Sequence, residues 1–287
     1  MGVSVCIIAS NEERNLGRCL DSAAFADERI VVVDARSADA TEEIARARGA
    51  RVLVHAYEGN VSQKNVALGL ANHDWVIALD ADEALSPELA AAIRDAVARD
   101  GGGWDGFEAN RLTWHLGRWI RHGDFFPDWQ LRVFRRQVGR WEGIDPHGRV
   151  RVDGRVGRLP GALHHWSYRD LADQVARIQE FSRVQAAALR ARGRRARVSD
   201  LVLRPPARFL RAYLLKRGFL DGVPGLVIAA ATAFHVFLKY AKLWEMERAP
   251  AGGAPEPAAG KAARCAPAGP AAGAPATGDA GGATSRG

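Results

Sequence analysis

Three carboxylates follow an apolar run in the stretch DWVIALDADEAL, which covers residues 74–85. They are Asp80, Asp82 and Glu83. The preceding run is rich in Val, Ile and Leu, which is typical of a strand inside a parallel sheet, and open α/β folds bind ligands at the carboxyl edge of such a sheet. Adjacent carboxylates repel each other at neutral pH, so we expect a compensating cation. A divalent metal with oxygen ligands is the simplest candidate.

The first hundred residues alternate between strand and helix patterns. Short β-rich runs are separated by segments rich in Ala, Glu and Arg, and they predict strands at 3–9, 29–34, 51–55 and 75–80. Ser86 and Pro87 have the residue types of a helix start, and Asp39 and Thr41 precede a second helical segment. This βα repeat predicts an α/β fold with a mixed, mainly parallel sheet flanked by helices.

After Gly106 the pattern changes to aromatic-rich runs that suit mixed strands and loops. Leu171–Arg192 and Leu201–Arg217 then have helical composition. Residues 249–287 are mainly Ala, Gly and Pro, so we expect a disordered tail. The expected organisation is therefore an α/β domain at 1–168, a helical region at 169–248 and the tail at 249–287.

The composition is that of a globular protein. The chain has 287 residues, a formal net charge of +7 and three cysteines, which excludes disorder throughout and a disulfide framework. A strand pattern at the N-terminus without a charged leader predicts a cytoplasmic protein. The excess of Lys and Arg lies between Arg111 and Arg217, where it suits nucleic acid, anionic lipid, a phosphorylated glycan or simply solvent.

Several classes of protein place Asp-x-Asp after a strand. In haloacid-dehalogenase phosphatases the motif follows the first strand and continues to a Thr, whereas here it follows the fourth and continues to Glu83. Sugar-phosphate nucleotidyltransferases open with a Gly-rich phosphate loop, where this chain has ASNEERNL, and they stay a distant alternative. A basic nucleic-acid-binding protein is a third alternative, but no recognition helix, zinc site or RNA-binding strand is evident. We therefore expect no nucleic-acid partner.

Four blocks of sequence carry a family resemblance: VCIIASNEERNL, IVVVDARSADAT, QKNVALGLANHDWVIALDADE and FPDWQLRVFRR. In this order and spacing they resemble a family 2 glycosyltransferase of the GT-A fold, in the branch that includes lipopolysaccharide-core β-1,4-glucosyltransferases. The resemblance runs from Val3 to about Trp244. It implies an inverting, metal-dependent enzyme that moves a hexose such as glucose from a UDP-sugar to a lipid-linked envelope glycan such as the lipopolysaccharide inner core.

The resemblance also implies a metal site. Transfer of a sugar from a nucleotide diphosphate requires the charge of the leaving diphosphate to be neutralised, which a metal bound by carboxylates does as a Lewis acid. In the family pattern Asp82 binds the metal directly, and Asp80 lies near both the metal and the ribose. Hard oxygen ligands favour Mg²⁺ or Mn²⁺. The alternative is a solvated turn before the helix at Ser86.

Two other strand ends are expected to hold the nucleotide. Asn11 and Glu13 follow the first strand and Asp34 ends the second, where the family places contacts to the uracil and ribose. Lys64 is a candidate contact to a phosphate, and a surface lysine is the alternative. Arg36 departs from the family pattern, which has a small residue there, and it either reaches the diphosphate or points to solvent.

The catalytic base must lie opposite the leaving diphosphate, because inversion by direct displacement removes a proton from the attacking hydroxyl on that face. We therefore expect it in the acceptor-side segment rather than in the metal cluster. Asp145 and His147, which flank a stiffening proline, are ranked level, followed by Asp128 and then Glu142. A plain turn residue is the alternative for Asp145.

Aromatic residues and histidines of the middle region have two interpretations each. Tryptophans cover sugar rings or fill a core, and both roles stay open for Trp114, Trp119, Trp129 and Trp141. A structural role is favoured for the adjacent histidines His164 and His165, because the sequence has no ligand-like partners for them at the spacing of a metal site.

A membrane contact is expected in the helical region. Val223–Leu238 is apolar, but it is shorter than the ~20 residues of a spanning helix and contains His235. Basic residues precede it, so an interfacial element on the inner-membrane surface is favoured over an ordinary buried helix. The expected localisation is therefore cytoplasmic and peripheral on the inner membrane.

Overall fold

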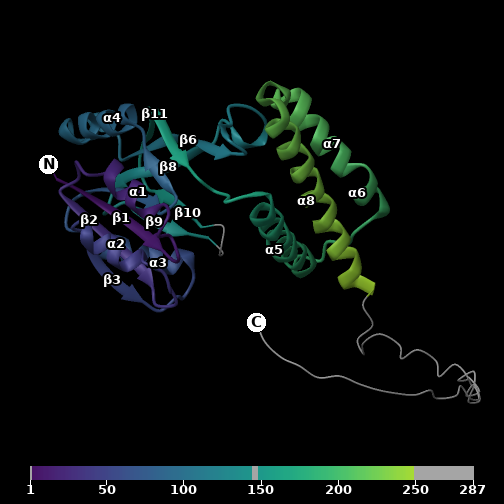
Figure 1. Ribbon diagram of the computed structural model, residues 1–287, viewed down its shortest axis with the longest axis horizontal. Coiled ribbons are helices and arrows are strands. Elements are labelled where there is room, and N and C mark those ends of the chain that lie inside the picture. The colour runs from purple at the N-terminus through teal and green to yellow at the C-terminus, as the bar shows by residue number, and fades with distance from the viewer. Residues whose placement is uncertain (1, 144–147, 249–287) are drawn as a thin grey trace, which may run out of the picture. The chain divides into compact units, whose positions relative to one another are not determined.

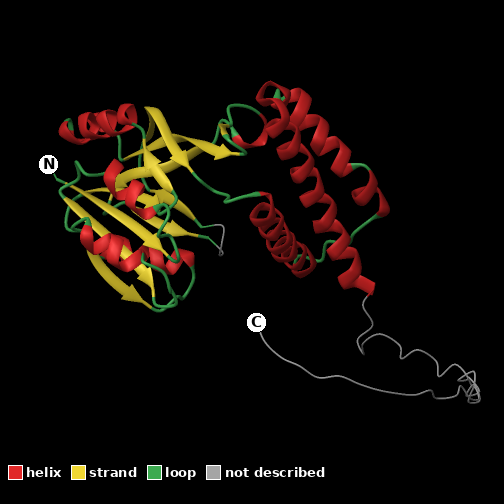
Figure 2. Ribbon diagram, in the orientation of Figure 1, coloured by secondary structure: helices red, strands yellow, loops and turns green. Residues whose placement is uncertain are grey.

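The computed structural model describes residues 2–143 and 148–248. In this part of the chain every strand precedes Trp166, and all regular structure after it is helical (Figure 2). Residues Met1–Glu247 group into one compact unit. The division at residue 168 stays a prediction, and the expected tail at 249–287 lies outside the described residues.

A mixed sheet positions the strand ends that carry the acidic residues (Figure 1). Its strand order is β3-β2-β1-β4-β8-β6-β11-β5, with β7 paired to β6, and β9 and β10 form a separate pair. The first four strands in this order are parallel, whereas β8 is antiparallel to both of its neighbours. The strands are β1 Val3–Ala9, β2 Glu28–Asp34, β3 Arg51–His55, β4 Trp75–Asp80, β5 Glu83–Leu85, β6 Gly106–His115, β7 Arg118–Trp119, β8 Trp129–Arg135, β9 Gly139–Glu142, β10 Arg149–Val152 and β11 Val156–His165.

Helices follow the strands of the parallel part and make up the region after the sheet. The α-helices are α1 Leu16–Ser22, α2 Thr41–Ala47, α3 Asn60–Gly69, α4 Pro87–Ala98, α5 Leu171–Ala191, α6 Val198–Val202, α7 Arg204–Leu210 and α8 Gly222–Arg248. Four short helical turns are η1 Asp100–Gly103, η2 Gly123–Phe125, η3 Arg211–Leu215 and η4 Gly218–Asp221. The Ser86 hydroxyl accepts a hydrogen bond from the Leu89 amide at 3.1 Å and Pro87 is the first helical residue, which confirms the predicted start of α4.

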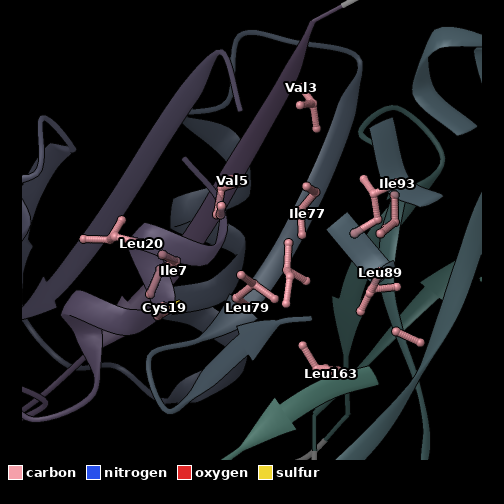
Figure 3. Packing of buried hydrophobic residues seen from close by; sticks show 14 of the residues in the cluster. Val3, Val5, Ile7, Cys19, Leu20, Ile77, Leu79, Leu89, Ile93 and Leu163 are labelled. Carbon is pink, nitrogen blue, oxygen red and sulfur yellow. The ribbon is translucent and has the colours of Figure 1, made fainter. Parts of the chain in front are cut away.

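Both faces of β1 and β4 are buried. Val5 and Ile7 of β1 have no exposed surface and pack with Leu20 of α1, while the α4 residues Leu89 and Ile93 belong to the same cluster (Figure 3). Alternate residues of a strand point to opposite faces, so Cys6 joins a second cluster on the other side of the sheet. Burial raises the pKa of the Cys6 thiol to about 12. The α/β fold class and the four predicted strands are confirmed.

Two helices of the C-terminal region differ from their predictions. The single helix expected at Leu201–Arg217 is divided, because α6 ends at Val202, α7 contains two prolines and η3 is π-helical. The apolar segment expected to end at Leu238 instead continues in α8 to Arg248. By length and composition, Gly218–Arg248 is long and apolar enough to cross a membrane, with a mean hydropathy of 1.5 over an 18-residue window. The argument that this segment is too short to span was therefore wrong.

Candidate active site

A cavity of about 540 Å³ lies at the carboxyl ends of β1, β2 and β4, the edge where the acidic cluster was expected. Ionisable side chains from seven separated stretches of the chain line it. These are Glu12, Asp34, Lys64, Asp80, Asp82, Arg111, His165 and Arg177. The cavity therefore combines carboxylates with several cationic groups.

The compensating cations of the acidic cluster come from the protein itself. Lys64 places its Nζ 2.5 Å from Asp80 Oδ1, and Arg132 places Nη2 2.7 Å from Asp80 Oδ2. The Arg132 guanidinium also contacts Glu83, with Nε 3.0 Å from Oε2 and Nη2 2.7 Å from Oε1. Arg111 lies 3.3 Å from the same Glu83 carboxylate. Glu83 has no exposed side-chain surface and Arg132 only 5%.

This network fixes the protonation of Asp80. Burial by itself would raise the pKa of Asp80, but the charges of Lys64 and Arg132 outweigh it and hold that pKa well below its ordinary value. The carboxylates of Glu83 and Asp80 likewise raise the pKa of the Arg132 guanidinium against the effect of its burial. Asp80 is therefore an ionised group held in a fixed orientation.

Asp82 faces a histidine rather than the basic network. His165 Nε2 lies 3.4 Å from Asp82 Oδ2, and His165 Nδ1 lies 3.3 Å from Thr113 Oγ1. The contact follows from the sheet, because β5 pairs antiparallel to β11 with Glu83 opposite His165. His165 therefore has an acidic partner in the cavity, and the structural role favoured for it from the sequence stays a prediction. His164 points elsewhere and stacks on Trp119 with ring centroids 4.4 Å apart.

The Asp82–His165 pair combines two kinds of metal-donor atom, with His165 Nε2 3.4 Å from Asp82 Oδ2. A carboxylate oxygen and an imidazole nitrogen are donors that Mn²⁺ and similar ions accept. In the described ranges no group of three or more His, Cys, Asp or Glu residues is arranged to hold a metal. Asp80, which the sequence also suggested as a ligand, has both carboxylate oxygens engaged by Lys64 and Arg132.

Asp34 carries an arginine partner that the sequence left undecided. It is 3% exposed and accepts hydrogen bonds from Arg36, with Nε 3.1 Å from each carboxylate oxygen and Nη2 2.6 Å from Oδ2. These hydrogen bonds lower the pKa of Asp34. The guanidinium also lies over the Tyr57 ring, 4.5 Å from its centroid. In this state Arg36 covers Asp34 and does not simply point to solvent.

The loop after β1 presents a different residue from those expected. The Asn11 side chain accepts a hydrogen bond from the Ala38 amide at 2.9 Å, and the Glu13 carboxylate accepts one from Ala40 at 3.4 Å. Both side chains hold the neighbouring loop, and neither lines the cavity. Glu12 lines it instead, and burial raises the pKa of this carboxyl. The sequence NEE indicated a carboxylate after β1, but only the geometry of the turn decides that Glu12, and not Glu13, faces the cavity.

Residues 4–151 match glycosyl transferase family 2, which is more than half of the chain. The protein belongs to this family. It is 28% identical to the lipopolysaccharide core biosynthesis glycosyltransferase LpsC of Rhizobium meliloti, over 85% of this chain and 92% of LpsC. An uncharacterized glycosyltransferase of Rickettsia typhi is also 28% identical, over 85% of this chain and 87% of that protein.

Among solved structures, S. aureus TarS 1–349 in complex with UDP-GlcNAc is 17% identical with a TM-score of 0.45, over 86% of this chain and 92% of that chain. At this TM-score the likeness supports no inference about this chain.

Two of the four candidates for the catalytic base of the glycosyltransferase, Asp128 and Glu142, lie among the described residues. Asp128 accepts hydrogen bonds from Arg111 Nε at 2.8 Å and from Gln130 at 2.6 Å, and its side chain is 30% exposed. Glu142 is bound by Arg140 at 2.6 Å on the β9–β10 pair. Asp145 and His147 lie outside the described residues. Asp128 therefore stands next to Arg111, which lines the cavity, and its role stays a prediction.

The glycosyltransferase also uses α5 and the segment before it to line the cavity. Tyr168, Arg177 and Phe181 come from this part of the chain. Burial raises the pKa of the Tyr168 hydroxyl. No pattern in the sequence connected these residues with the acidic cluster, because about ninety positions separate the two in the chain. Helical periodicity identified α5 but not the group it faces.

The tryptophans of the middle region divide between several environments. Trp141 borders the basic network, with Lys64 Nζ 4.1 Å from its ring centroid. Trp114 and Trp119 form an edge-to-face pair with centroids 5.1 Å apart, and Trp129 lies under Arg158. Among the four, Trp141 therefore has a contact to a cavity residue.

Proposed function

We propose that this family 2 glycosyltransferase is an inverting enzyme that transfers a hexose, glucose in the first instance, from a UDP-sugar to a lipid-linked envelope glycan such as the lipopolysaccharide inner core. The observation that carries the proposal is the strand-end cavity, which sets the Asp82–His165 pair beside Lys64 and Arg111. The name of the R. meliloti relative supports the choice of acceptor.

Asp82 and His165 would hold the Mg²⁺ or Mn²⁺ ion of the proposed reaction. When bound, such an ion supplies Lewis-acid neutralisation of the leaving diphosphate. Asp80 would add a fixed negative charge next to Asp82, because Lys64 and Arg132 hold its carboxylate in place and keep it ionised. Lys64, Arg111 and Arg177 add positive charge at the cavity wall, which favours an anionic donor.

The nucleoside of the donor would bind at Asp34, whose carboxylate lines the cavity at the end of β2. Because Arg36 occupies that carboxylate, donor binding requires Arg36 either to share it or to move aside. Glu12 takes the place in this proposal that Asn11 and Glu13 had on sequence grounds. A carboxylate there accepts hydrogen bonds from ribose hydroxyls.

The proton of the attacking hydroxyl would go to a base among Asp145, His147 and Asp128. Asp128 is held in a fixed orientation by Arg111, as a positioned base requires. The acceptor and its lipid place the enzyme at the cytoplasmic face of the inner membrane.

A donor screen tests this proposal. UDP release is measured with several nucleotide sugars and Mn²⁺, with and without extracted lipopolysaccharide as acceptor. We expect release that depends on a UDP-hexose and increases with the acceptor, and a higher melting temperature with that donor. Stabilisation by an oligonucleotide or a nucleoside triphosphate, without any UDP release, would contradict the proposal.

A further inference from the structure

The connection between α7 and α8 exposes a contiguous set of large apolar side chains. We call residues 210–226 the apolar turn. Leu215 is 81% exposed and Val223 is 72% exposed. The other exposed large apolar residues of the turn are Leu210, Leu214, Phe219, Leu220 and Leu226. Single exposed apolar residues are normal in soluble proteins, whereas a contiguous group indicates an interaction surface.

The apolar turn is held by buried ionic contacts. Asp221 has no exposed surface, and its carboxylate accepts hydrogen bonds from the backbone amides of Arg121 at 3.0 Å and His122 at 2.7 Å. The side chain of Asp124 is 4% exposed and lies 3.0 Å from Lys216 Nζ. Two carboxylates therefore fix the turn to the segment between β7 and β8. The apolar side chains are therefore exposed even though the turn that carries them is held in place by buried contacts.

The charges of the apolar turn select an anionic partner. Between Arg204 and Leu226 the chain has five basic residues and a single carboxylate, Asp221, which is buried. Lys216 is engaged by Asp124, while Arg211 and Arg217 are exposed beside the apolar side chains. Apolar side chains that alternate with cations match the boundary between acyl chains and anionic headgroups.

The packing of α8 decides between lying on a bilayer and crossing it. From His235 onward α8 is bound to α5: His235 Nε2 is 3.3 Å from Gln185 Oε1, and Lys242 Nζ is 2.6 Å from the Gln179 carbonyl oxygen. Leu243 has no exposed surface in this contact. The part of α8 before His235 extends about 20 Å at ~1.5 Å per residue, which is short of the ~30 Å hydrocarbon core.

Helix α5 cannot accompany α8 into hydrocarbon. Its sequence LADQVARIQEFSRVQAAALRA contains charged residues throughout, including the exposed pair Glu180 and Arg183. Charged side chains of this kind are costly inside a bilayer. With α5 attached, the apolar turn and the first turns of α8 keep exposed apolar side chains that lipid can reach.

We propose that the apolar turn, residues 210–226, is a docking surface for the anionic phospholipid bilayer, lying in the interface while α8 stays packed on α5. Its apolar side chains enter the acyl boundary, and Arg211 and Arg217 contact phosphate groups of the lipid. The inference rests on the proposed function only in that a lipid-linked acceptor gives this contact its purpose.

Vesicle co-sedimentation tests the docking surface with the full-length protein. We expect binding to vesicles that contain phosphatidylglycerol, and binding weaker by at least tenfold to pure phosphatidylcholine, since each basic residue near an anionic surface contributes about 1 kcal/mol. The double variant Leu215→Glu/Val223→Glu is expected to lose binding by at least tenfold. Arg211→Gln/Arg217→Gln is expected to lose most of the preference for phosphatidylglycerol.

Val198→Glu is the matched control, because Val198 is 67% exposed but lies on α6, outside the apolar turn. It is expected to bind as the unmodified protein does. Equal vesicle binding by Leu215→Glu/Val223→Glu and the unmodified protein overturns the proposal. If the unmodified protein is a dimer and this variant a monomer that binds vesicles equally well, the surface is a dimer interface, and the proposal is likewise overturned. UDP release from the donor with extracted lipopolysaccharide, without phospholipid vesicles, is measured in parallel, and its absence contradicts the proposed function but not the docking surface.

Discussion

At the carboxyl edge of the sheet, charged side chains are buried, whereas in the helices after α5, large apolar side chains are exposed. Glu83 and Arg132 are 0% and 5% exposed in the first region, and Leu215 is 81% exposed in the second. Both regions reverse the usual distribution of residues in a globular protein. Each reversal has an energetic cost that some partner must offset.

The two regions differ in where that partner is found. The buried charges at the sheet edge are paired within the chain, by Lys64, Arg111 and Arg132. The exposed apolar residues of the turn have no comparable partner in the described part of the protein. A paired charged site is ready to bind a small charged ligand, while an uncovered apolar surface requires a second, larger body. The following predictions test this contrast, from the largest expected effect to the smallest.

The largest effect is expected for Asp82→Ala. Loss of the carboxylate that faces His165 removes the proposed metal donor, so turnover should fall on the order of 10³-fold, because a metal contributes several kcal/mol of charge stabilisation. UDP release with saturating Mn²⁺ measures the loss. The melting temperature should stay nearly unchanged, since Asp82 is outside the hydrophobic core clusters. Asp95→Ala, on α4 and outside the cavity, is the control, and near-normal turnover of Asp82→Ala would refute the metal assignment.

A large effect on folding is expected for Glu83→Gln. This change removes the fully buried carboxylate that Arg132 and Arg111 share, so that Arg132 keeps only Asp80 and Arg111 only Asp128 as acidic partners, and we expect the free energy of unfolding to fall by about 3 kcal/mol. Urea denaturation measures it. Glu108→Gln is the matched control, because Glu108 pairs with the exposed Arg158 and should change stability by less than about 1 kcal/mol. Equal effects of the two changes would mean that the sheet edge is no more dependent on its internal pairs than the surface is.

The base candidates should separate in turnover rather than in donor binding. Replacing the true base, in Asp145→Asn, His147→Ala or Asp128→Asn, should lower the turnover number on the order of 10²-fold at saturating donor and acceptor. Donor affinity, measured by titration, should remain within about threefold of the unmodified enzyme, since the base contacts the acceptor. Glu142→Gln, the lowest-ranked candidate of the same segment, is measured alongside them. Wild-type rates in all four variants would place the base outside this segment.

The smallest effect is expected within the helices, at Asp200. Burial would raise the pKa of Asp200, but hydrogen bonds from the Arg197 amide and from Arg204, together with the charge of Arg194, lower it below its ordinary value. A lowered folded-state pKa stabilises the protein above the unfolded pKa of about 3.9, and this contribution is lost as the pH falls through the folded value. Asp200→Asn should therefore cost about 1.5 kcal/mol at pH 7 and progressively less as the pH falls below the unfolded pKa.

Denaturation curves from pH 7 to pH 2.5 measure this difference. Glu180→Gln, which breaks an exposed pair with Arg183 in the same region, is the control and should be nearly neutral at every pH. A cost for Asp200→Asn that does not change with pH would show that the lost interaction is not ionic.

Local pattern was sufficient for the elements that position the site. The β-rich runs fixed β1, β3 and β4 to the residue, and Ser86 with Pro87 fixed the start of α4. Strand and helix formation depend on neighbouring residues, whose burial period and capping groups are written in a short stretch of chain. The family blocks were equally readable, since each lies within a short continuous stretch of the chain.

Pairing between distant stretches was decided by the tertiary structure. The sequence indicated that the acidic cluster needs cations, but β8 must lie antiparallel beside β4 before Arg132 can reach Asp80 and Glu83. His165 faces Asp82 for a similar reason, because β5 pairs with β11. Neither neighbour relation follows from composition or periodicity.

In the helical region too, the sequence determined some features and the tertiary structure decided others. Sequence alone determined that the segment after residue 222 is an apolar helix preceded by basic residues. Only the structure shows that half of α8 is bound to the charged α5, which limits the surface that is free to meet lipid. Composition states what a segment prefers to contact, whereas the packing of its neighbours determines which of its faces remain available.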